Sequence, residues 1–111
     1  MKLITAIIKD CQLDSVCEAV QKLGVPSVET SEIATVSDTG RDPRTKIEFI
    51  VLDDLFERAV EAVLLHANTG KIGAGKLWVT DPSLLVRIRT DEKCRRGDCG
   101  DYEYAHKGDI D

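Results

Sequence analysis

The sequence predicts an α+β fold in which two helices cover one face of an antiparallel sheet. Three observations lead to this prediction: apolar runs rich in β-branched residues, two segments with apolar residues at helical spacing, and their order along the chain. The elements follow one another as β-α-β-β-α-β, the split arrangement of a ferredoxin-like fold. At 111 residues the chain is long enough for one domain and too short for two.

The first strand and the first helix are predicted near the N-terminus. Leu3–Lys9 is a continuous apolar run rich in β-branched residues, which is typical of a buried central strand. Helical spacing follows, and Ser15 with Glu18 is placed as in a capping box. Gly24 is expected to end this helix. The apolar stripe of the helix consists of Leu13, Val16, Cys17, Val20 and Leu23.

Two further strands are predicted in the middle of the chain. Pro26 imposes an extended entry to a strand at Ser27–Val36. Ser37–Pro43 is polar and rich in turn residues, so we expect a loop there. The third strand is predicted at Lys46–Leu52.

A second helix and two short strands follow. Asp53 and Asp54 are expected to cap the helix. The strands Lys76–Thr80 and Leu84–Thr90 are expected to form a tight hairpin. The residues after them, 91–111, lose all periodicity and are expected to form a tail. The apolar stripe of the second helix consists of Phe56, Ala59, Val60, Val63, Leu64 and Ala67.

Both faces of the sheet are predicted to be largely apolar. Ile47, Phe49 and Val51 alternate onto one face of the third strand. Further apolar residues are expected on the face that the helices leave open. A monomer would expose that face to water, so we expect an oligomer that covers it. These residues are Ile4, Ala6, Ile8, Ile50 and Leu52.

A glycine-rich segment, Thr69–Lys76, predicts a loop that can bind phosphate. Its glycines allow backbone N–H groups to approach an anion closely. Gly70 to Lys76 matches the spacing of a P-loop, but Leu77 stands where Ser or Thr would hold Mg²⁺. A strand follows instead of a helix, so the segment is not that of a P-loop NTPase. The alternative interpretation is an ordinary turn between a helix and a strand.

Two arginines in the last strand are candidates for the same site. Period-two alternation places Arg87 and Arg89 on one face of the strand. Guanidinium groups suit phosphate oxygens, although a solvated strand face would look the same. We expect the arginines and the glycine-rich segment to border one cleft.

The net charge of the chain argues against several classes of partner. The chain has 15 basic and 20 acidic residues, which gives a formal net charge of −5. This charge disfavours broad binding to nucleic acid or anionic lipid. The apolar runs are too short to span a membrane, so we expect a cytoplasmic protein without direct membrane insertion.

Two cysteines near the C-terminus are a candidate redox pair. Cys94 and Cys99 bracket a segment that contains Arg95, Arg96 and Gly97. The cations favour thiolate, and the glycine allows a small ring to close. Two inert thiols are the alternative. Zinc is less favoured because the spacing is not that of a zinc site.

Several segments together resemble the PII signal-transduction proteins. The similarity covers residues 1–36 and 44–90, and the two nucleotide-contacting loops of the family are its most specific part. The matching segments are Met1–Lys9, Leu13–Asp14, Lys46–Glu48, Asp53–Asp54, Thr69–Lys76 as the B-loop and Val86–Thr90 as the C-loop.

The resemblance implies an architecture and a ligand. Residues 1–90 would form a ferredoxin-like domain and residues 91–111 a tail. The domain would carry a short T-loop at 37–43, the B-loop at 69–76 and the C-loop at 84–90. The family forms homotrimers, with adenine nucleotides in the clefts between neighbouring subunits.

The resemblance also assigns residues to the nucleotide site. B-loop residues would hold the phosphates, and C-loop arginines would reach them. The last two residues of the predicted third strand would line the base pocket. Two more arginines match basic residues that flank the family's T-loop. In that order, the set is Gly70, Lys71, Gly73, Ala74, Gly75 and Lys76; Arg87 and Arg89; Val51 and Leu52; Arg41 and Arg44.

The chain also departs from the PII pattern. Its T-loop is short and lacks both the tyrosine that is modified and the glutamine that joins Mg²⁺ and 2-oxoglutarate. Asp10-Cys11 replaces the family's Pro-Phe, and Ala74 replaces the B-loop aspartate. These features resemble two groups of PII relatives that act in inorganic-carbon metabolism. One group is the carboxysome-associated PII-like proteins, which bind ADP or AMP with bicarbonate. The other is the regulators of bicarbonate transporters.

The sequence therefore predicts a trimeric, non-catalytic sensor of ADP, AMP or ATP that acts with bicarbonate in inorganic-carbon regulation. Its partner would be a transporter or a carboxysome-related protein, and it would need no metal or prosthetic group. The alternatives are a nitrogen-regulatory PII paralogue, a slow ATP or ADP phosphohydrolase, and a CutA-like metal-binding trimer. Neither His66 nor His106 supplies an evident catalytic base.

Overall fold

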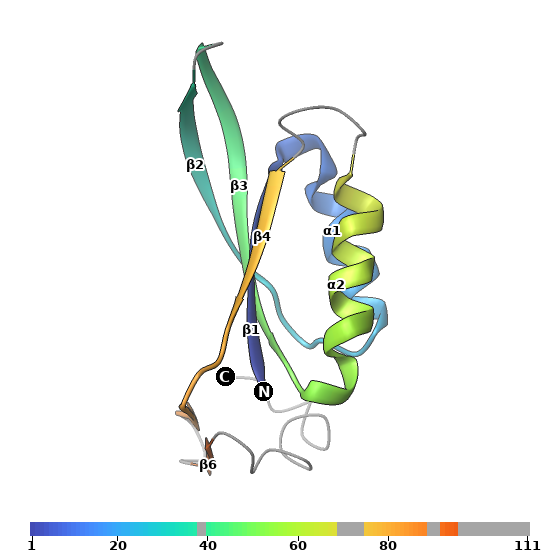
Figure 1. Ribbon diagram of the computed structural model, residues 1–111, viewed down its shortest axis with the longest axis vertical. Helices are drawn as coiled ribbons and strands as arrows, with labels where there is room; N and C mark the ends of the chain where they lie inside the picture. Colours follow the sequence, from blue (N-terminus) through green and yellow to red (C-terminus); the bar gives the residue numbers. More distant parts are fainter. Residues whose placement is uncertain (38–39, 69–74, 89–91, 96–111) are drawn as a thin grey trace.

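Four antiparallel strands form a sheet in the order β2-β3-β1-β4, and both helices pack on one face of it (Figure 1). The computed structural model describes residues 1–37, 40–68, 75–88 and 92–95. The order β1-α1-β2-β3-α2-β4 confirms the predicted α+β, ferredoxin-like fold. The elements are β1 Lys2–Lys9, the 3₁₀ helix η1 Asp10–Gln12, α1 Leu13–Lys22, β2 Glu29–Ser37, β3 Gly40–Val51, α2 Asp53–Ala67, β4 Gly75–Thr80, β5 Leu84–Arg87 and β6 Glu92–Arg95.

Strand β1 is one of the two inner strands of the sheet. It pairs along its whole length with β3, from Lys2 opposite Val51 to Lys9 opposite Arg44. On its other side it pairs with β4. We call the end of the sheet at Lys9 the head and the end at Lys2 the foot. Helix α2 begins at the foot and ends at the head, beside the first residue of β4 (Figure 1).

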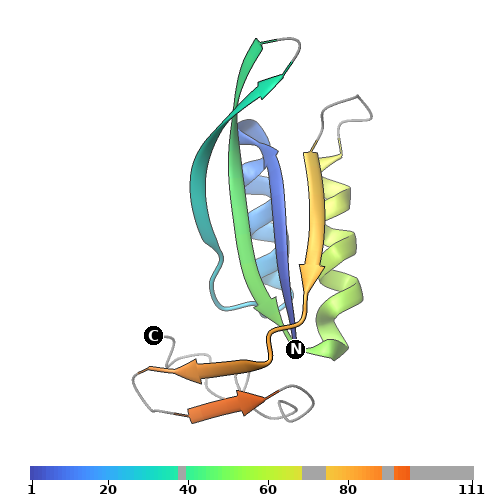
Figure 2. The ribbon, with the colours of Figure 1, turned by 60° about the vertical axis from the view of Figure 1, so that its left-hand side comes forward.

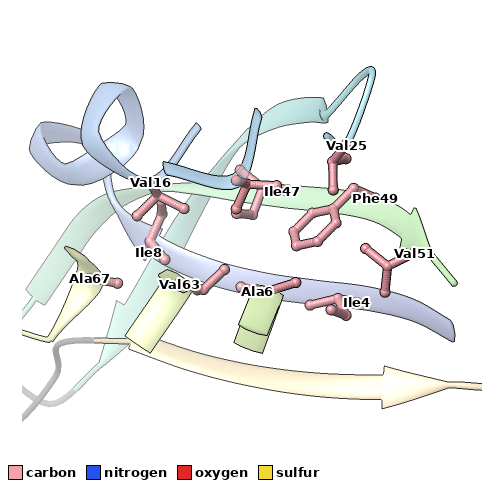
Figure 3. Packing of buried hydrophobic residues seen from close by; sticks show 12 residues of the cluster. Ile4, Ala6, Ile8, Val16, Val25, Ile47, Phe49, Val51, Val63 and Ala67 are labelled. Carbon is pink, nitrogen blue, oxygen red and sulfur yellow. The ribbon is translucent and has the colours of Figure 1, made fainter. Parts of the chain in front are cut away.

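The hydrophobic core lies between the sheet and the two helices (Figure 3). The register sets Ile4 opposite Phe49 and Ala6 opposite Ile47, so these side chains share the helix-facing side. The prediction that Ile4, Ala6 and Ile8 face away from the helices is therefore wrong. A continuous apolar run fits either orientation of a strand, and only pairing with β3 decides between them.

The open face of the sheet is mixed in character. The register places Leu3, Thr5 and Ile7 of β1 on it, with Trp78 beside Thr5. Thr5 is 3% exposed. Its Oγ1 donates a hydrogen bond to Glu48 Oε2 at 3.2 Å. The second face, predicted to be largely apolar, instead has apolar residues among polar and charged ones.

The helix starts differ from the capping predictions. Ser15 lies inside α1, which follows η1 directly and has Gln12 at its N-cap without a side-chain hydrogen bond. Asp53 and Asp54 occupy the first turn of α2 and do not cap it, since Leu52 holds the N-cap position. Acidic groups there still stabilise the helix through its dipole. Gly24 follows the end of α1 with φ 104°, as a C-terminal glycine should.

Strands β2 and β3 form a hairpin that extends beyond the rest of the sheet (Figure 1). Pairing continues to Ser37 opposite Gly40, so two residues connect the strands. The expected polar loop at 37–43 is therefore wrong for Ser37, which belongs to β2, and for residues 40–43, which belong to β3. Pro43 is tolerated because β1 ends at Lys9 and leaves that edge of β3 unpaired.

The chain leaves the main sheet after β4 and forms a second, two-stranded sheet (Figure 2). Strand β5 pairs with β6 from Leu84 opposite Arg95 to Arg87 opposite Glu92. The predicted tight hairpin between β4 and β5 is wrong, because β5 takes its partner from the region expected to be a tail. Leu85 attaches this small sheet to the foot by packing against Met1 and Leu52.

Among the described residues, no helix is both long and apolar enough to cross a membrane.

Candidate functional site

Gly75 marks the point where the glycine-rich segment enters the sheet. It has φ 139°, a conformation that other residues rarely adopt. A Cβ atom at this position would overlap the carbonyl oxygen of Ile7. The backbone of β4 therefore lies against β1 at the head, and only glycine permits this approach.

Four basic residues gather on the open face near the head. Lys46 and Lys76 lie on either side of Ile7, and Arg44 lies opposite Lys9. Lys76 is exposed, whereas Arg44 is 9% exposed. We call Lys9, Arg44, Lys46 and Lys76 the cationic corner. In a chain of net negative charge, it concentrates positive charge beside the entry of the glycine-rich segment.

One acidic partner lies next to the cationic corner on the open face. Lys46 Nζ lies 3.9 Å from Glu48 Oε1, and Glu48 also accepts the hydrogen bond from Thr5. At this distance, and with both side chains more than a third exposed, the ion pair is weak. Lys46 therefore remains available to an anionic ligand.

A second carboxylate lies at the head itself. Thr45 Oγ1 donates a hydrogen bond to Asp10 Oδ1 at 2.6 Å. This bond joins η1 to β3 next to Arg44. Sequence reasoning missed it because the two residues are 35 positions apart and neither belongs to a recognisable motif.

A cavity of about 220 Å³ lies on the helix side of the head. It opens between the end of α2, at Ala67 and Asn68, and the start of β4, at Gly75. Ile8 and Val63 contribute to its largely apolar lining. Such a lining does not suit phosphate, so the cationic corner is the better candidate for an anion.

The other predicted site residues lie away from the cationic corner. Val51 is fully buried in the core, and Leu52 belongs to the small cluster at the foot. Arg41 is exposed on the extended part of the β2–β3 hairpin. Arg87 lies in β5, which is attached at the foot. Strand β4 has six residues, and at about 3.3 Å each it separates head from foot by about 20 Å.

Several predicted positions lie outside the described residues or outside their described side chains. Arg87 and Cys94 are placed in strands, but their side chains are not described. The Cys94–Cys99 pair and the phosphate-holding role of the B-loop stay predictions. The positions outside the described residues are Gly70, Lys71, Gly73, Ala74, Arg89 and Cys99.

The foot contains interactions that the sequence did not reveal. The side chain of Met1 is 1% exposed, and its N-terminal ammonium lies 2.6 Å from Asp53 Oδ1. This hydrogen bond, together with the ammonium charge, lowers the pKa of Asp53. Lys2 Nζ lies 2.8 Å from Asp81 Oδ1 and 5.9 Å from the centre of the Phe56 ring. These pairs hold β1, α2 and the exit from β4 together.

Two further cysteines lie in and beside α1. Cys11 is exposed and Cys17 is half-buried, and both are free thiols. Burial raises the pKa of Cys17, and the carboxylate of Asp14 adds to this effect. In the part of the chain that the structure describes, no three His, Cys, Asp or Glu residues are grouped so that they could hold a metal ion.

Comparison with known proteins connects this arrangement with one family. The family model described as nitrogen regulatory protein P-II matches residues 1–92. A nitrogen regulatory protein P-II from Azospirillum brasilense is 40% identical over 107 residues, which cover 84% of this chain and 96% of that protein. Its counterpart from Bradyrhizobium diazoefficiens is 38% identical over 109 residues, with 83% and 95% covered. Nitrogen regulatory protein P-II 1 of Escherichia coli strain K12 is 36% identical, with 84% and 96% covered. The chain belongs to the nitrogen regulatory protein P-II family.

Proposed function

We propose that this chain senses adenine nucleotides at clefts between the subunits of a homotrimer and reports their occupancy to a partner protein. P-II proteins are signalling regulators rather than enzymes, they form trimers, and they bind adenine nucleotides. Family membership therefore favours a regulator over the phosphohydrolase and CutA-like alternatives. The positions that bind the nucleotide in this chain are our proposal.

The separation of the candidate residues between head and foot carries the proposal. Lys76 and Arg44 lie at the head, whereas Leu52 and Arg87 lie at or beside the foot. About 20 Å of strand separates the two groups, which is too far for one nucleotide's phosphates to contact both directly. A cleft that uses both groups therefore needs the head of one subunit beside the foot of another.

The surface at the foot supports such an arrangement. Leu84, Val86 and Ile88 are 43%, 38% and 89% exposed. A two-stranded sheet with exposed apolar residues is marginal by itself and gains stability when another surface covers it. A neighbouring subunit would cover these residues and so bring β5, which carries Arg87, to the interface between subunits.

Nitrogen signalling is the process that the relatives favour. The three proteins described above all carry nitrogen regulation in their names. They support the nitrogen-regulatory alternative over the inorganic-carbon prediction. We therefore propose a nitrogen-regulatory role. Bicarbonate binding, carboxysome association and a transporter partner have no support from these relatives.

One structural feature keeps inorganic-carbon regulation as the second candidate. The hairpin from Glu29 to Val51 has only two residues between its paired strands, at the position of the T-loop. So short a connection leaves no room for the tyrosine and glutamine through which the family's long T-loop acts. Identifying the small ligand that binds together with the nucleotide then decides whether the protein acts in nitrogen or in inorganic-carbon regulation.

Calorimetric titration tests the site assignment. We expect Lys76→Ala to weaken ADP binding by about 1.5–3 kcal/mol, the range of hydrogen bonds to charged groups. Lys22→Ala is the matched control, because Lys22 is an exposed lysine that pairs with Glu18 on α1, far from the head. ADP affinity equal in the wild-type protein and in Lys76→Ala would contradict the proposed site.

A ligand panel separates the two processes. AMP, ADP, ATP and cyclic AMP are each titrated alone, with 2-oxoglutarate and Mg²⁺, and with bicarbonate. Nucleotide affinity raised by 2-oxoglutarate supports nitrogen signalling, and affinity raised by bicarbonate supports the second candidate. A protein that binds none of the four nucleotides would overturn the proposed function.

A further inference from the structure

The cationic corner concentrates positive charge on the open face of the sheet. Lys46 and Lys76 lie on either side of β1, and Lys9 lies opposite Arg44. Lys76 is exposed, and the side chain of Lys46 is 37% exposed. Lys46 pairs only weakly with Glu48, at 3.9 Å. The corner can therefore bind a segment that brings carboxylates to it.

Residues 96–111 carry most of the excess negative charge of the chain. They lie outside the described residues, and we call them the acidic segment. They contain five acidic and two basic residues, which gives −3 of the formal net charge of −5. The acidic segment and the cationic corner are therefore complementary in charge. The acidic residues of the segment are Asp98, Asp101, Glu103, Asp109 and Asp111.

The acidic segment follows an element that is attached at the foot. Strand β6 ends at Arg95, which lies opposite Leu84, and the neighbouring Leu85 packs on the foot (Figure 2). Asp101 and Glu103 follow Arg95 by six and eight residues. At about 3.3 Å per residue, they can lie up to about 20 and 26 Å from it, whereas β4 separates foot from head by about 20 Å. The chain is therefore long enough to bring both carboxylates to the cationic corner.

We propose that the acidic segment binds the cationic corner through Asp101 and Glu103 and competes there with anionic ligands. Carboxylates accept charge-assisted hydrogen bonds from lysine and arginine, as phosphates do. A ligand must displace the segment before it binds, so the contact is autoinhibitory. The inference rests on the proposed function where that ligand is an adenine nucleotide.

The covalent connection determines how strong the competition is. A connection of a few residues gives the carboxylates an effective concentration on the order of 1 mM at the corner. A contact with a dissociation constant of about 0.1–1 mM then weakens ADP binding about two- to tenfold. Salt screens exposed charges over about 10 Å at 0.1 M ionic strength, so the competition should fade as salt is added.

The decisive variant combines Asp101→Asn with Glu103→Gln. The amides remove two negative charges and remain polar groups of similar size. We expect the affinity for ADP, measured by calorimetry on the full chain, to rise about two- to tenfold at low salt. The ratio of variant to wild-type affinity should approach one at high salt.

Glu57→Gln combined with Glu61→Gln is the matched control. Both residues are exposed on α2, which packs on the other face of the sheet (Figure 1). This double variant changes the net charge of the molecule by the same amount, and we expect its affinity for ADP to stay close to that of the wild-type protein. An equal rise in the two double variants would show a general effect of net charge and overturn the inference.

Carbodiimide cross-linking locates the acidic segment without any nucleotide. The reagent joins a carboxylate to a lysine amine in contact with it, and peptide mass spectrometry identifies both residues. We expect Asp101 or Glu103 of the wild-type protein to be joined to Lys76 or Lys46, and fewer cross-links at high salt. Lys22, an exposed lysine on α1, should remain unlinked to the segment. Links to Lys22 as frequent as those to Lys76 would contradict a specific contact.

The outcomes separate this inference from the proposed function. If the wild-type protein binds ADP but forms no cross-link at the corner, the inference is wrong and the nucleotide site stands. ADP affinity that is unchanged in the Asp101→Asn, Glu103→Gln variant at low salt also overturns the inference. If the cross-links form and the protein binds none of the adenine nucleotides, the proposed function is wrong and the contact of the acidic segment is supported.

Discussion

Gly75 joins the glycine-rich segment to β4 where the backbone of β1 leaves no room for a side chain. Both its positive φ and its contact with Ile7 require glycine. Gly40 begins β3 with a similar φ of 113°, but a Cβ atom there would meet open space. A substitution at Gly40 would therefore introduce backbone strain alone, whereas one at Gly75 would introduce both backbone strain and steric overlap.

Alanine at each position should reveal this difference. Gly40→Ala is expected to cost about 1–3 kcal/mol, which is the strain of an unfavourable backbone conformation. Gly75→Ala carries similar strain and must also push β4 away from β1, so it should lower the free energy of unfolding further. Urea denaturation of both variants gives the comparison. Equal losses would show that the strands separate without penalty.

The ion pair between Met1 and Asp53 predicts a dependence of stability on pH. The ammonium of Met1 lowers the pKa of the Asp53 carboxyl in the folded protein. The bond therefore contributes stability above the ordinary carboxyl pKa of about 4, and this contribution is lost as pH falls through the lower folded value.

Asp53→Asn should accordingly destabilise the protein at pH 7 and have less effect at pH 3. Asp54→Asn is the control, since Asp54 shares the first turn of α2 and its interaction with the helix dipole. Urea denaturation of both variants at the two pH values measures the difference. A loss in Asp53→Asn that is the same at both would contradict the role of the ion pair.

At the scale of elements, the small β5–β6 sheet depends on alternation along β5. Leu85 points to the foot and packs with Met1 and Leu52, whereas Leu84 and Val86 are exposed. One side chain thus attaches this sheet to the domain, and its two neighbours are left for another surface.

Leu85→Ala should detach the small sheet without unfolding the domain. We expect faster hydrogen exchange at β5 amides and a loss of about 1 kcal/mol or more, consistent with a half-buried leucine. Leu84→Ala removes the same atoms from the opposite side and should leave β5 protected in a dilute monomer. Protection retained in Leu85→Ala would mean that the backbone alone holds the sheet.

The elements also show where sequence reasoning succeeds and where it stops. The helical spacing of apolar residues indicates α1, and Gly24 indicates where it ends. Both signals are local in the sequence. The face of the sheet on which Ile4 lies is decided by pairing with Phe49, 45 positions away. The continuous apolar run around Ile4 does not show which alternate residues face the helices. Similarly, Pro43 suggests a loop locally, yet strand pairing extends past it.

The residues of the candidate site also fall into those with a local sequence signal and those that only strand register brings together. The glycine at position 75 and the lysine that follows it stand out in the sequence because the segment is rich in both residue types, and their phosphate-binding role stays a prediction. The convergence of Arg44 on Lys9 and the bond from Thr45 to Asp10 depend on register, which the sequence does not state. The division of the predicted residues between head and foot depends on the whole fold.

At the scale of the whole molecule, the exposed apolar residues of the open face and of β5 favour an assembly. Trp78 is 40% exposed on that face, and Ile88 is 89% exposed beside the small sheet. We expect multi-angle light scattering to give three times the chain mass at micromolar concentration. A stable monomer would remove the intersubunit cleft, and the nucleotide model with it.

The short connection between β2 and β3 also determines how the molecule can meet a partner. Pairing from Ala34 opposite Pro43 to Ser37 opposite Gly40 orders this ribbon before any partner arrives. Docking then requires little loss of backbone conformational entropy, so modest contacts suffice for binding. A preorganised ribbon also cannot reshape itself for dissimilar targets. It suits one complementary surface.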